Sequence, residues 1–300
     1  MKEPFAARTV RASWRNKLIN PVLNKEFKLR MRTPRAMWTL FFYLFAIGLM
    51  ALSAIYLLEV NTGNGQSFNP EQSKLLFYFL SMAQLGLIAF MAPGLTAGVI
   101  SGEREKQTLN LLLTTQQSSA TIVLSKLVSS LSFMVLIVLS TIPVYGMVFL
   151  YGGISPKQLV LVFLFYVFIM LVLGSFGILF SSLFKRTMIS VIVTYGVTLF
   201  IFGGTALVFF VLVGTMERVP QSNLNNYTWI GHILAWNPVA ALYSILDPSV
   251  TGQAYSAFRN PPTGQQAPLA LWKEFMIIYT VLSVAALWLG IRGLRPRLKK

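Results

Sequence analysis

The chain has 300 residues, of which 55% are hydrophobic and only 11% are charged, and its formal net charge is +16. Ordinary soluble domains carry about 25% charged residues, so this composition excludes a water-soluble protein and requires contact with hydrocarbon. The absence of cysteine excludes a disulfide, a thiolate nucleophile and a cysteine metal site, and the single histidine excludes a histidine-rich metal cluster. We therefore expect no cofactor and no metal.

The positive charge is concentrated at the two ends of the sequence. Ten of the 25 basic residues lie within residues 1–35 and five within residues 292–300, whereas the centre is nearly neutral. Such a distribution is typical of membrane topology rather than of a nucleic-acid footprint. Nucleic acid is therefore not an expected partner.

Six charge-free apolar runs predict the fold class. A helix that crosses about 30 Å of hydrocarbon needs about 20 apolar residues, and lipid offers backbone groups no hydrogen-bond partner, so the runs should be helices. We expect an all-α integral membrane protein with six transmembrane helices, forming one transmembrane domain over residues 1–300, with bends at Pro93 and Pro143. The spans are expected within Ala36–Leu58, Leu75–Gly102, Leu127–Pro156, Gln158–Phe184, Thr187–Met216 and the shorter Phe275–Ile291.

The hydrophilic connections predict that both termini lie in the cytoplasm. In that orientation twenty basic residues lie inside, within 1–35, 101–126, 185–186 and 292–300, and five lie outside. Cytoplasmic segments of membrane proteins carry an excess of Lys and Arg. We therefore expect a multi-pass protein of the cytoplasmic membrane with both ends inside.

Residues 217–270 form the predicted external loop, which contains one ambiguous apolar stretch. Trp229–Leu246 has enough residues to be considered as a span, but Asn237 and Pro238 interrupt it. A seventh span would place one basic terminus outside, so we expect a re-entrant segment at the outer interface, where Trp and Tyr rings settle. The alternative is that this stretch spans the membrane.

Residues 1–35 are expected to be a cytoplasmic basic arm that ends in an interfacial helix at about Pro21–Arg32. Apolar and basic side chains occupy different faces of this helix, as in helices that lie in the membrane interface. The alternative is an anchor that only fixes topology. The residues singled out in this elbow are Lys25, Glu26, Phe27 and Arg32.

The loop at residues 101–126 says most about function. It begins with four charged residues and continues with leucines at helical spacing, which predicts a short amphipathic helix on the cytoplasmic surface with Ser101 as its N-terminal cap. Its mixed charges do not suit an anionic lipid surface, which attracts purely basic clusters. A protein partner therefore fits this helix better than lipid headgroups do.

The string from Glu103 to Leu113, followed by Lys126, resembles the signature of ABC-2 type transporter permeases. In that family the loop after the second span reads acid–basic–acid–x–Gly-Thr-Leu-x-x-Leu-Leu. Three positions depart from the usual pattern, because Gln107 stands in place of glycine, Asn110 in place of a frequent Glu, and Gln116 in place of a common proline. The stretches Lys25-Glu26-Phe27 and Arg32-Thr33-Pro34 also resemble the N-terminal elbow of that family.

The resemblance implies a permease subunit of an ATP-binding cassette transporter, most often an exporter. Two permeases, a second copy or a paralogue, would enclose the pathway within membrane lipid, and separate ABC ATPase subunits would bind below. The sequence has no G-x-x-x-x-G-K-[ST] phosphate loop, so ATP hydrolysis is expected from the partner chain. In the coupling helix, Glu103, Arg104, Glu105, Lys106 and Thr108 would supply polar contacts to the ATPase, and Leu109 and Leu112 would seat the helix.

Glycines mark two further places. Gly94, Gly98 and Gly102 recur every four residues at the inner end of the second span and predict a ridge of close helix approach, either to another subunit or within the chain. Gly203 and Gly204 are expected to loosen the fifth span.

The first five predicted spans contain no Asp, Glu, Lys or Arg, which argues against an ion-coupled carrier and favours an apolar or amphipathic cargo. Two other function classes stay open at this point. An integral membrane lipid-modifying enzyme would need converging polar groups, for which His232 and Asp247 are the candidate pair, although we assign no catalytic residue. A non-transporting scaffold or sensor would use the same cytoplasmic helix to dock a partner.

Overall fold

A computed structural model of the chain describes residues 33–62, 70–108, 118–150, 152–216, 230–255 and 269–294. All the regular structure in these segments is helical, which confirms the predicted fold class. The predicted elbow with Lys25, Glu26, Phe27 and Arg32 lies outside the described residues, as do Leu109 and Leu112 of the predicted coupling helix.

The described residues contain six helical stretches that are long and apolar enough to cross a membrane, as predicted. Three of the six are interrupted. The first three spans are α3 (Pro34–Thr62), α4 (Pro70–Thr96) with the short α5 (Ser101–Glu105), and α7 (Ser119–Leu139) with α8 (Ile142–Leu150). The last three are α9 (Pro156–Leu183), then α10 (Thr187–Leu199) with the π-helical turn η1 (Phe200–Gly204) and α11 (Thr205–Met216), and finally α15 (Leu271–Leu294).

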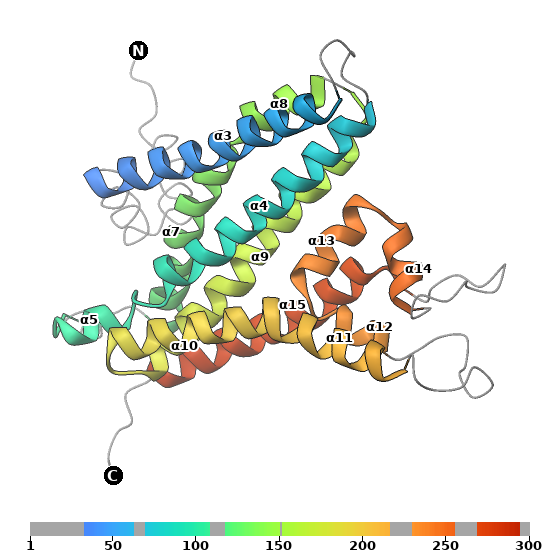
Figure 1. Cartoon of the computed structure of the whole chain (residues 1–300). Helices are drawn as coiled ribbons and strands as arrows, with labels where there is room; N and C mark the ends of the chain where they lie inside the picture. The colour runs from blue at the N-terminus through green and yellow to red at the C-terminus, as the bar shows by residue number, and fades with distance from the viewer. Residues whose placement is uncertain are drawn as a thin grey trace, which may run out of the picture.

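Helix α9 is central to the bundle, since α4, α7, α10 and α15 all pack against it. Figure 1 shows α4 and α9 running together through the middle, with α3 and α8 on one side and α10 and α15 on the other. The start of α3, the short α5 and the end of α15 lie at one end of the bundle (Figure 1). The opposite end carries the helices of the predicted external segment.

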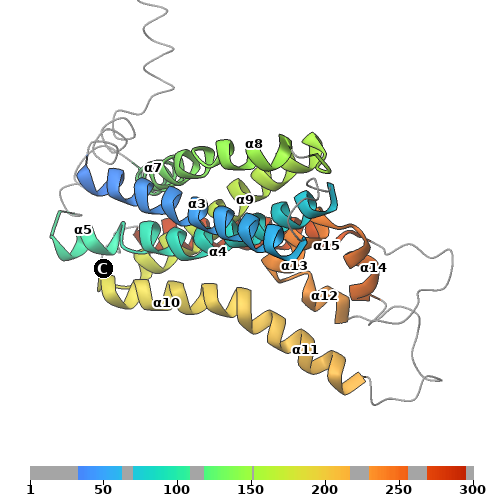
Figure 2. The same cartoon turned by 45° about the horizontal axis from the view of Figure 1, so that its top comes forward.

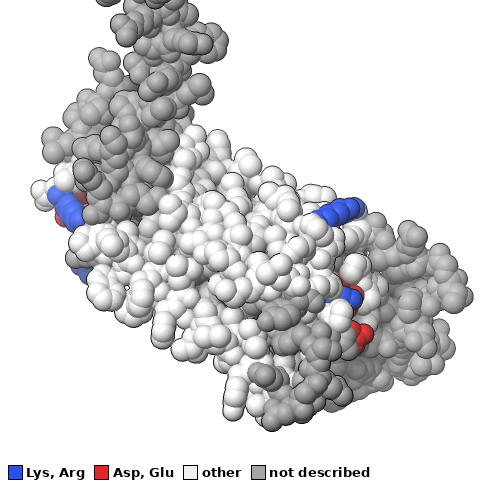
Figure 3. Space-filling model, turned by 90° about the horizontal axis from the view of Figure 1, so that it is seen from above, with Lys and Arg blue, Asp and Glu red and all other residues white. Residues whose placement is uncertain are grey.

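The surface between these two ends is apolar. In the view of Figure 3 the Lys, Arg, Asp and Glu side chains gather at the two ends of the molecule, and the middle carries none. Large apolar side chains are exposed along this middle surface, among them Phe42 on α3, Phe90 on α4 and Phe200 on η1. Such a belt suits contact with hydrocarbon.

The third span breaks next to the predicted proline. The ring of Pro143 excludes a regular helix because it crowds the carbonyl of the residue four positions earlier, Leu139, and α7 ends there. At the break, the amide Nε2 of Gln84 on α4 donates to Oγ1 of Thr141 over 3.0 Å, and both side chains are buried. By contrast, α4 continues through Pro93.

The ambiguous external stretch forms two short helices, α12 (Ile230–Leu234) and α13 (Pro238–Leu246), followed by α14 (Ser249–Tyr255). Pro238 starts α13 because its missing N–H needs no partner in the first turn of a helix. None of the three helices has enough residues to cross a membrane. Their position as a re-entrant segment at an outer interface stays a prediction.

Candidate coupling site

Helix α5 is fixed at its start by a residue of the fourth span. Oγ of Ser181 on α9 accepts the N–H groups of Ile100 and Ser101 over 2.8 and 2.9 Å. The first N–H groups of a helix lack partners within the helix, and here a buried hydroxyl from another span satisfies two of them. The prediction that Ser101 caps its own helix is therefore wrong: its hydroxyl bonds the carbonyl of Ala97 instead.

Helix α5 ends in a Schellman motif centred on Gln107. The N–H of Gln107 donates to the carbonyl of Arg104 over 3.1 Å, and the N–H of Thr108 donates to the carbonyl of Glu103 over 3.0 Å. This closing pattern needs a left-handed residue, which is usually glycine, and Gln107 adopts φ 58°. The glycine that the family pattern carries at this position thus has a physical reason, and Gln107 departs from it at a cost in backbone strain.

Replacing Gln107 with glycine is expected to raise stability by about 1 kcal/mol, because a side chain in the left-handed region costs roughly 1–2 kcal/mol per residue. The same change at Lys106, whose φ is −78°, serves as the control and should lower stability or leave it unchanged. Thermal unfolding of both variants in detergent would check this. A lower melting temperature for Gln107→Gly would contradict the assignment of the motif.

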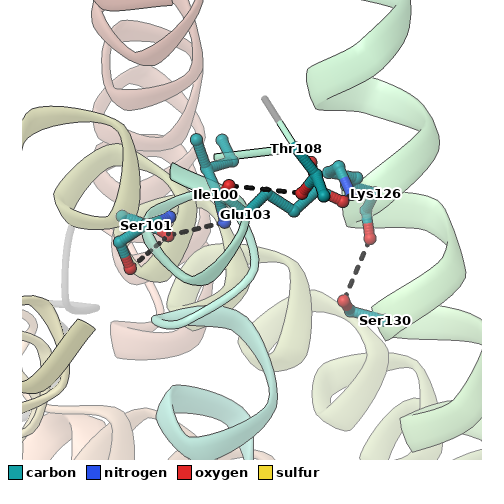
Figure 4. Close-up of polar contacts among 7 residues, drawn as sticks. Ile100, Ser101, Glu103, Thr108, Lys126 and Ser130 are labelled. Carbon is teal, nitrogen blue, oxygen red and sulfur yellow. Dashed lines mark hydrogen bonds and ion pairs between the residues drawn. The ribbon is translucent and has the colours of Figure 1, made fainter. Parts of the chain in front are cut away.

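Glu103 is paired with Lys126 of the third span. The ammonium of Lys126 donates to Oε1 of Glu103, and only 4% of the lysine side chain and 24% of the glutamate side chain are exposed. Figure 4 shows the two side chains facing each other between α5 and α7. Because both charges are largely removed from water, each depends on the other for its stability. This pair therefore binds α5 to α7.

Arg104 reaches the opposite way, to the end of α9. Its guanidinium donates to the carbonyl oxygens of Ser182 over 3.1 Å and of Phe184 over 3.3 Å. The last carbonyls of a helix lack partners and carry partial negative charge. A cation is therefore the appropriate charge at this position.

Glu105 completes the series at the start of α10. Its two carboxylate oxygens accept the N–H of Thr187 over 2.7 Å and the hydroxyl of Thr187 over 2.8 Å. The N-terminus of a helix carries partial positive charge and unpaired N–H groups, so an anion is favoured there. The acid–basic–acid order of residues 103–105 thus matches a lysine, a helix C-terminus and a helix N-terminus on three different spans.

The three residues that follow lie at the surface. Lys106, Gln107 and Thr108 are exposed, and the Thr108 hydroxyl donates to the carbonyl of Glu103 over 3.2 Å. Glu105 is exposed as well, so the outward surface of the site comprises residues 105–108.

The predicted glycine ridge faces α10 of the same chain. A Cβ on Gly94 would meet the hydroxyl of Tyr195 at 3.0 Å, and one on Gly98 would meet Cγ2 of Thr187 at 3.1 Å. Gly102 has Oγ1 of Thr187 at 3.8 Å from such a Cβ. Of the two readings given for this ridge, the geometry matches packing within one chain.

Three residues of this junction were not singled out from the sequence. Ser181, Thr187 and Ser190, whose hydroxyl donates to the carbonyl of Ala97 over 2.6 Å, look like ordinary polar residues at helix ends. The available signal was the basic pair just before Thr187, which predicts that the start of α10 lies at a cytoplasmic helix end.

At the opposite end, the structure does not bring His232 and Asp247 together. Nδ1 of His232 lies 2.7 Å from Oε1 of Glu274, and Oδ1 of Asp247 accepts the N–H of Ser249 over 3.0 Å. The hydroxyl of Tyr255 donates to Oε2 of Glu274 over 2.5 Å. Burial, and then the Glu274 carboxylate, raise the pKa of Tyr255, so its phenol stays protonated. The cluster joins helices and offers no activated nucleophile, and no group of three or more His, Cys, Asp or Glu within the described segments is placed to hold a metal.

The six apolar helices and the apolar belt define a helical, multi-pass membrane protein. A model of the ABC-2 family transporter proteins matches residues 20–292, and the chain belongs to that family. It is thus a membrane component of a transporter. No curated protein matches the sequence significantly.

Proposed function

We propose that this chain is a permease subunit that couples to separate ABC ATPase subunits through residues 101–126. Membership of the ABC-2 family supports an ATPase partner, and the sequence has no phosphate loop of its own. The observation that carries the proposal is the set of contacts at Glu103, Arg104 and Glu105, which link one short surface helix to three spans. A push on that helix reaches α7, α9 and α10 together.

We propose different tasks for neighbouring residues of this helix. Glu103, Arg104 and Glu105 transmit motion into the membrane bundle. The exposed Glu105 also lies on the surface offered to the ATPase, as the family resemblance implied. Lys106 is exposed at the outward surface and meets the ATPase, together with Leu109 and Leu112 beyond it in sequence. The elbow at residues 1–35 moves with this surface.

The orientation and the assembly belong to the same proposal. The start of α3 and the end of α15 lie at the end of the bundle that carries α5 (Figure 1), and the basic residues of the sequence concentrate in segments that join this end. By the positive-inside rule this end faces the cytoplasm. A second permease, identical or paralogous, completes the pathway in membrane lipid. The charge-free central stretches of the first five spans suit export of an apolar or amphipathic cargo.

Changing Glu105 to lysine is expected to abolish most transport while the ATPase still co-purifies, because a cation at the start of α10 opposes the helix dipole and loses both bonds to Thr187. Changing Lys106 to glutamate is the matched control and should instead weaken co-purification. The measurement combines co-purification with co-expressed ABC ATPase subunits and cargo-stimulated ATP hydrolysis in vesicles. Full transport by the Glu105 variant, or absence of any ATPase partner, would contradict the proposal.

A further inference from the structure

The fifth span contains a π-helical turn that is bonded from outside the helix. In η1 the wider turn interrupts the regular ladder of α-helical hydrogen bonds, and an unpaired carbonyl is costly in a protein surrounded by lipid. The amide Nδ2 of Asn237 donates to the carbonyl of Phe202 over 2.7 Å and to Oγ1 of Thr205 over 3.0 Å. A residue 35 positions away in sequence therefore stabilises the turn.

The other half of the same amide holds α13. Oδ1 of Asn237 accepts the N–H groups of Val239 and Ala240 over 2.8 and 3.2 Å, which makes Asn237 the N-cap of this helix. Its side chain is 2% exposed and uses both its donors and both its acceptor sites. One buried side chain thus connects the π-helical turn to α13.

Helix α13 is held in place by hydrogen bonds to three spans. Its last carbonyl, on Leu246, accepts the hydroxyl of Tyr78 on α4 and Nε2 of Gln158 on α9, both over 2.7 Å. The hydroxyl of Ser244 accepts the N–H of Trp272 on α15 over 3.1 Å. The turn just before α13 is held as well, since Tyr279 donates to the carbonyl of Trp236 over 2.9 Å.

The two halves of the fifth span are attached to different parts of the molecule. Helix α10 is bonded to α5 through Thr187 and to the segment after α4 through Ser190. Helix α11 instead packs on α12, with Phe209 and Val213 buried against Leu234. Figure 2 shows that the span changes direction between α10 and α11. The turn η1 therefore joins a helix bonded to α5 to a helix packed on α12.

We propose that the fifth span is a two-part lever hinged at η1, and that Asn237 is the positioning residue that sets the angle between α10 and α11. Bends in long helices occur at π-turns. A Cβ added to Gly203 would meet no neighbour within 4 Å, so the turn has open space on that side, whereas one added to Gly204 would meet the ring of Phe200 at 2.6 Å. The part of the proposal in which α5 drives α10 depends on the proposed coupling function. The angle itself does not.

The angle is measurable by spin labelling, since the chain has no native cysteine. The substitutions Ile192→Cys on α10 and Phe210→Cys on α11 place labels at positions that are each 67% exposed. Asn237→Ser keeps a hydroxyl oxygen to cap α13 and loses both amide donors to η1. The distance between the two spin labels is measured in lipid nanodiscs by double electron–electron resonance. The doubly labelled parent should give a single narrow distance distribution, and Asn237→Ser should give a wider, shifted one.

Two controls make the result specific. Tyr279→Phe removes a bond that holds the same outer helices without touching η1, so its distribution should match the parent. Thr205→Val removes one of the two acceptors of Asn237 and should partly widen the distance distribution. This variant tests the proposal if Asn237→Ser does not fold. A parent-like distribution in both Asn237→Ser and Thr205→Val, or equal widening in Tyr279→Phe, would overturn the proposal. The permease is measured without an ATPase, so failure of the coupling function leaves this result unaffected.

Discussion

Replacing Lys126 with methionine is expected to destabilise the folded permease by about 3 kcal/mol, since removing one partner of a buried ion pair costs about 3–5 kcal/mol. Lys126 is 4% exposed and neutralises Glu103 at the junction of α5 and α7. Oε2 of Glu103 is buried and bonds no partner among the described residues, so loss of the ammonium leaves the carboxylate poorly compensated. Helix α5 should detach from α7 first.

The double variant Lys126→Met with Glu103→Gln separates charge from packing. It removes both charges, so it should recover most of the lost stability, because a buried pair replaced by neutral groups is often close to neutral in stability. Equilibrium unfolding in mixed micelles, followed by tryptophan fluorescence, would give the free energies. Equal losses for the single and double variants would show that the pair matters for packing and not for charge.

Replacing Gly177 with alanine is the second change with a large expected effect. A Cβ there would lie 2.0 Å from Oγ1 and 2.8 Å from Cβ of Thr96, and 3.2 Å from the backbone nitrogen of Ala97. Cβ of Thr96 is attached directly to the backbone and cannot rotate away as the far end of a flexible side chain does. The helices α4 and α9 must therefore separate, at an overpacking cost of about 3 kcal/mol. Because Thr96 and Ala97 connect α4 to α5, the coupling site should be displaced too.

The matched control for this change is Gly86→Ala, in α4 itself. A Cβ on Gly86 meets nothing within 4 Å, and alanine is favoured over glycine inside a helix by about 0.5–1 kcal/mol. The two variants add the same methyl group and should shift the unfolding midpoint in opposite directions. The difference between them measures the effect of the close packing of α4 on α9. Similar effects from both would contradict the close packing of α4 on α9.

The spans were predictable from the sequence because hydrocarbon imposes both their length and their composition. The six apolar runs each lie largely within one of the six helical stretches. The helices extend beyond the apolar runs where charged residues occupy the first turn, as Glu71 does in α4. A helix continues past the hydrocarbon edge as long as its backbone bonds are satisfied. The break at Pro143 was predictable because a proline ring crowds the carbonyl four residues earlier.

The π-turn and the contacts of the site were not predictable in the same way. Gly203 and Gly204 indicated a loosened fifth span, but the bond that fixes the turn comes from Asn237, which the sequence suggested only as an interruption. Likewise, the charges of residues 103–105 predicted a polar surface helix. Their partners Ser182 and Thr187 lie about 80 positions away, at separations of 78 and 82 residues, and only the folded chain brings them together.

We propose that the exposed surface around Lys106 receives work from a cytoplasmic ATPase. With no native cysteine, Lys106→Cys provides a single reactive thiol on this exposed surface. A membrane-impermeant maleimide should label it in inside-out vesicles and not in intact cells, and bound ATPase subunits should protect it. Labelling in intact cells would place α5 on the outside and contradict the account.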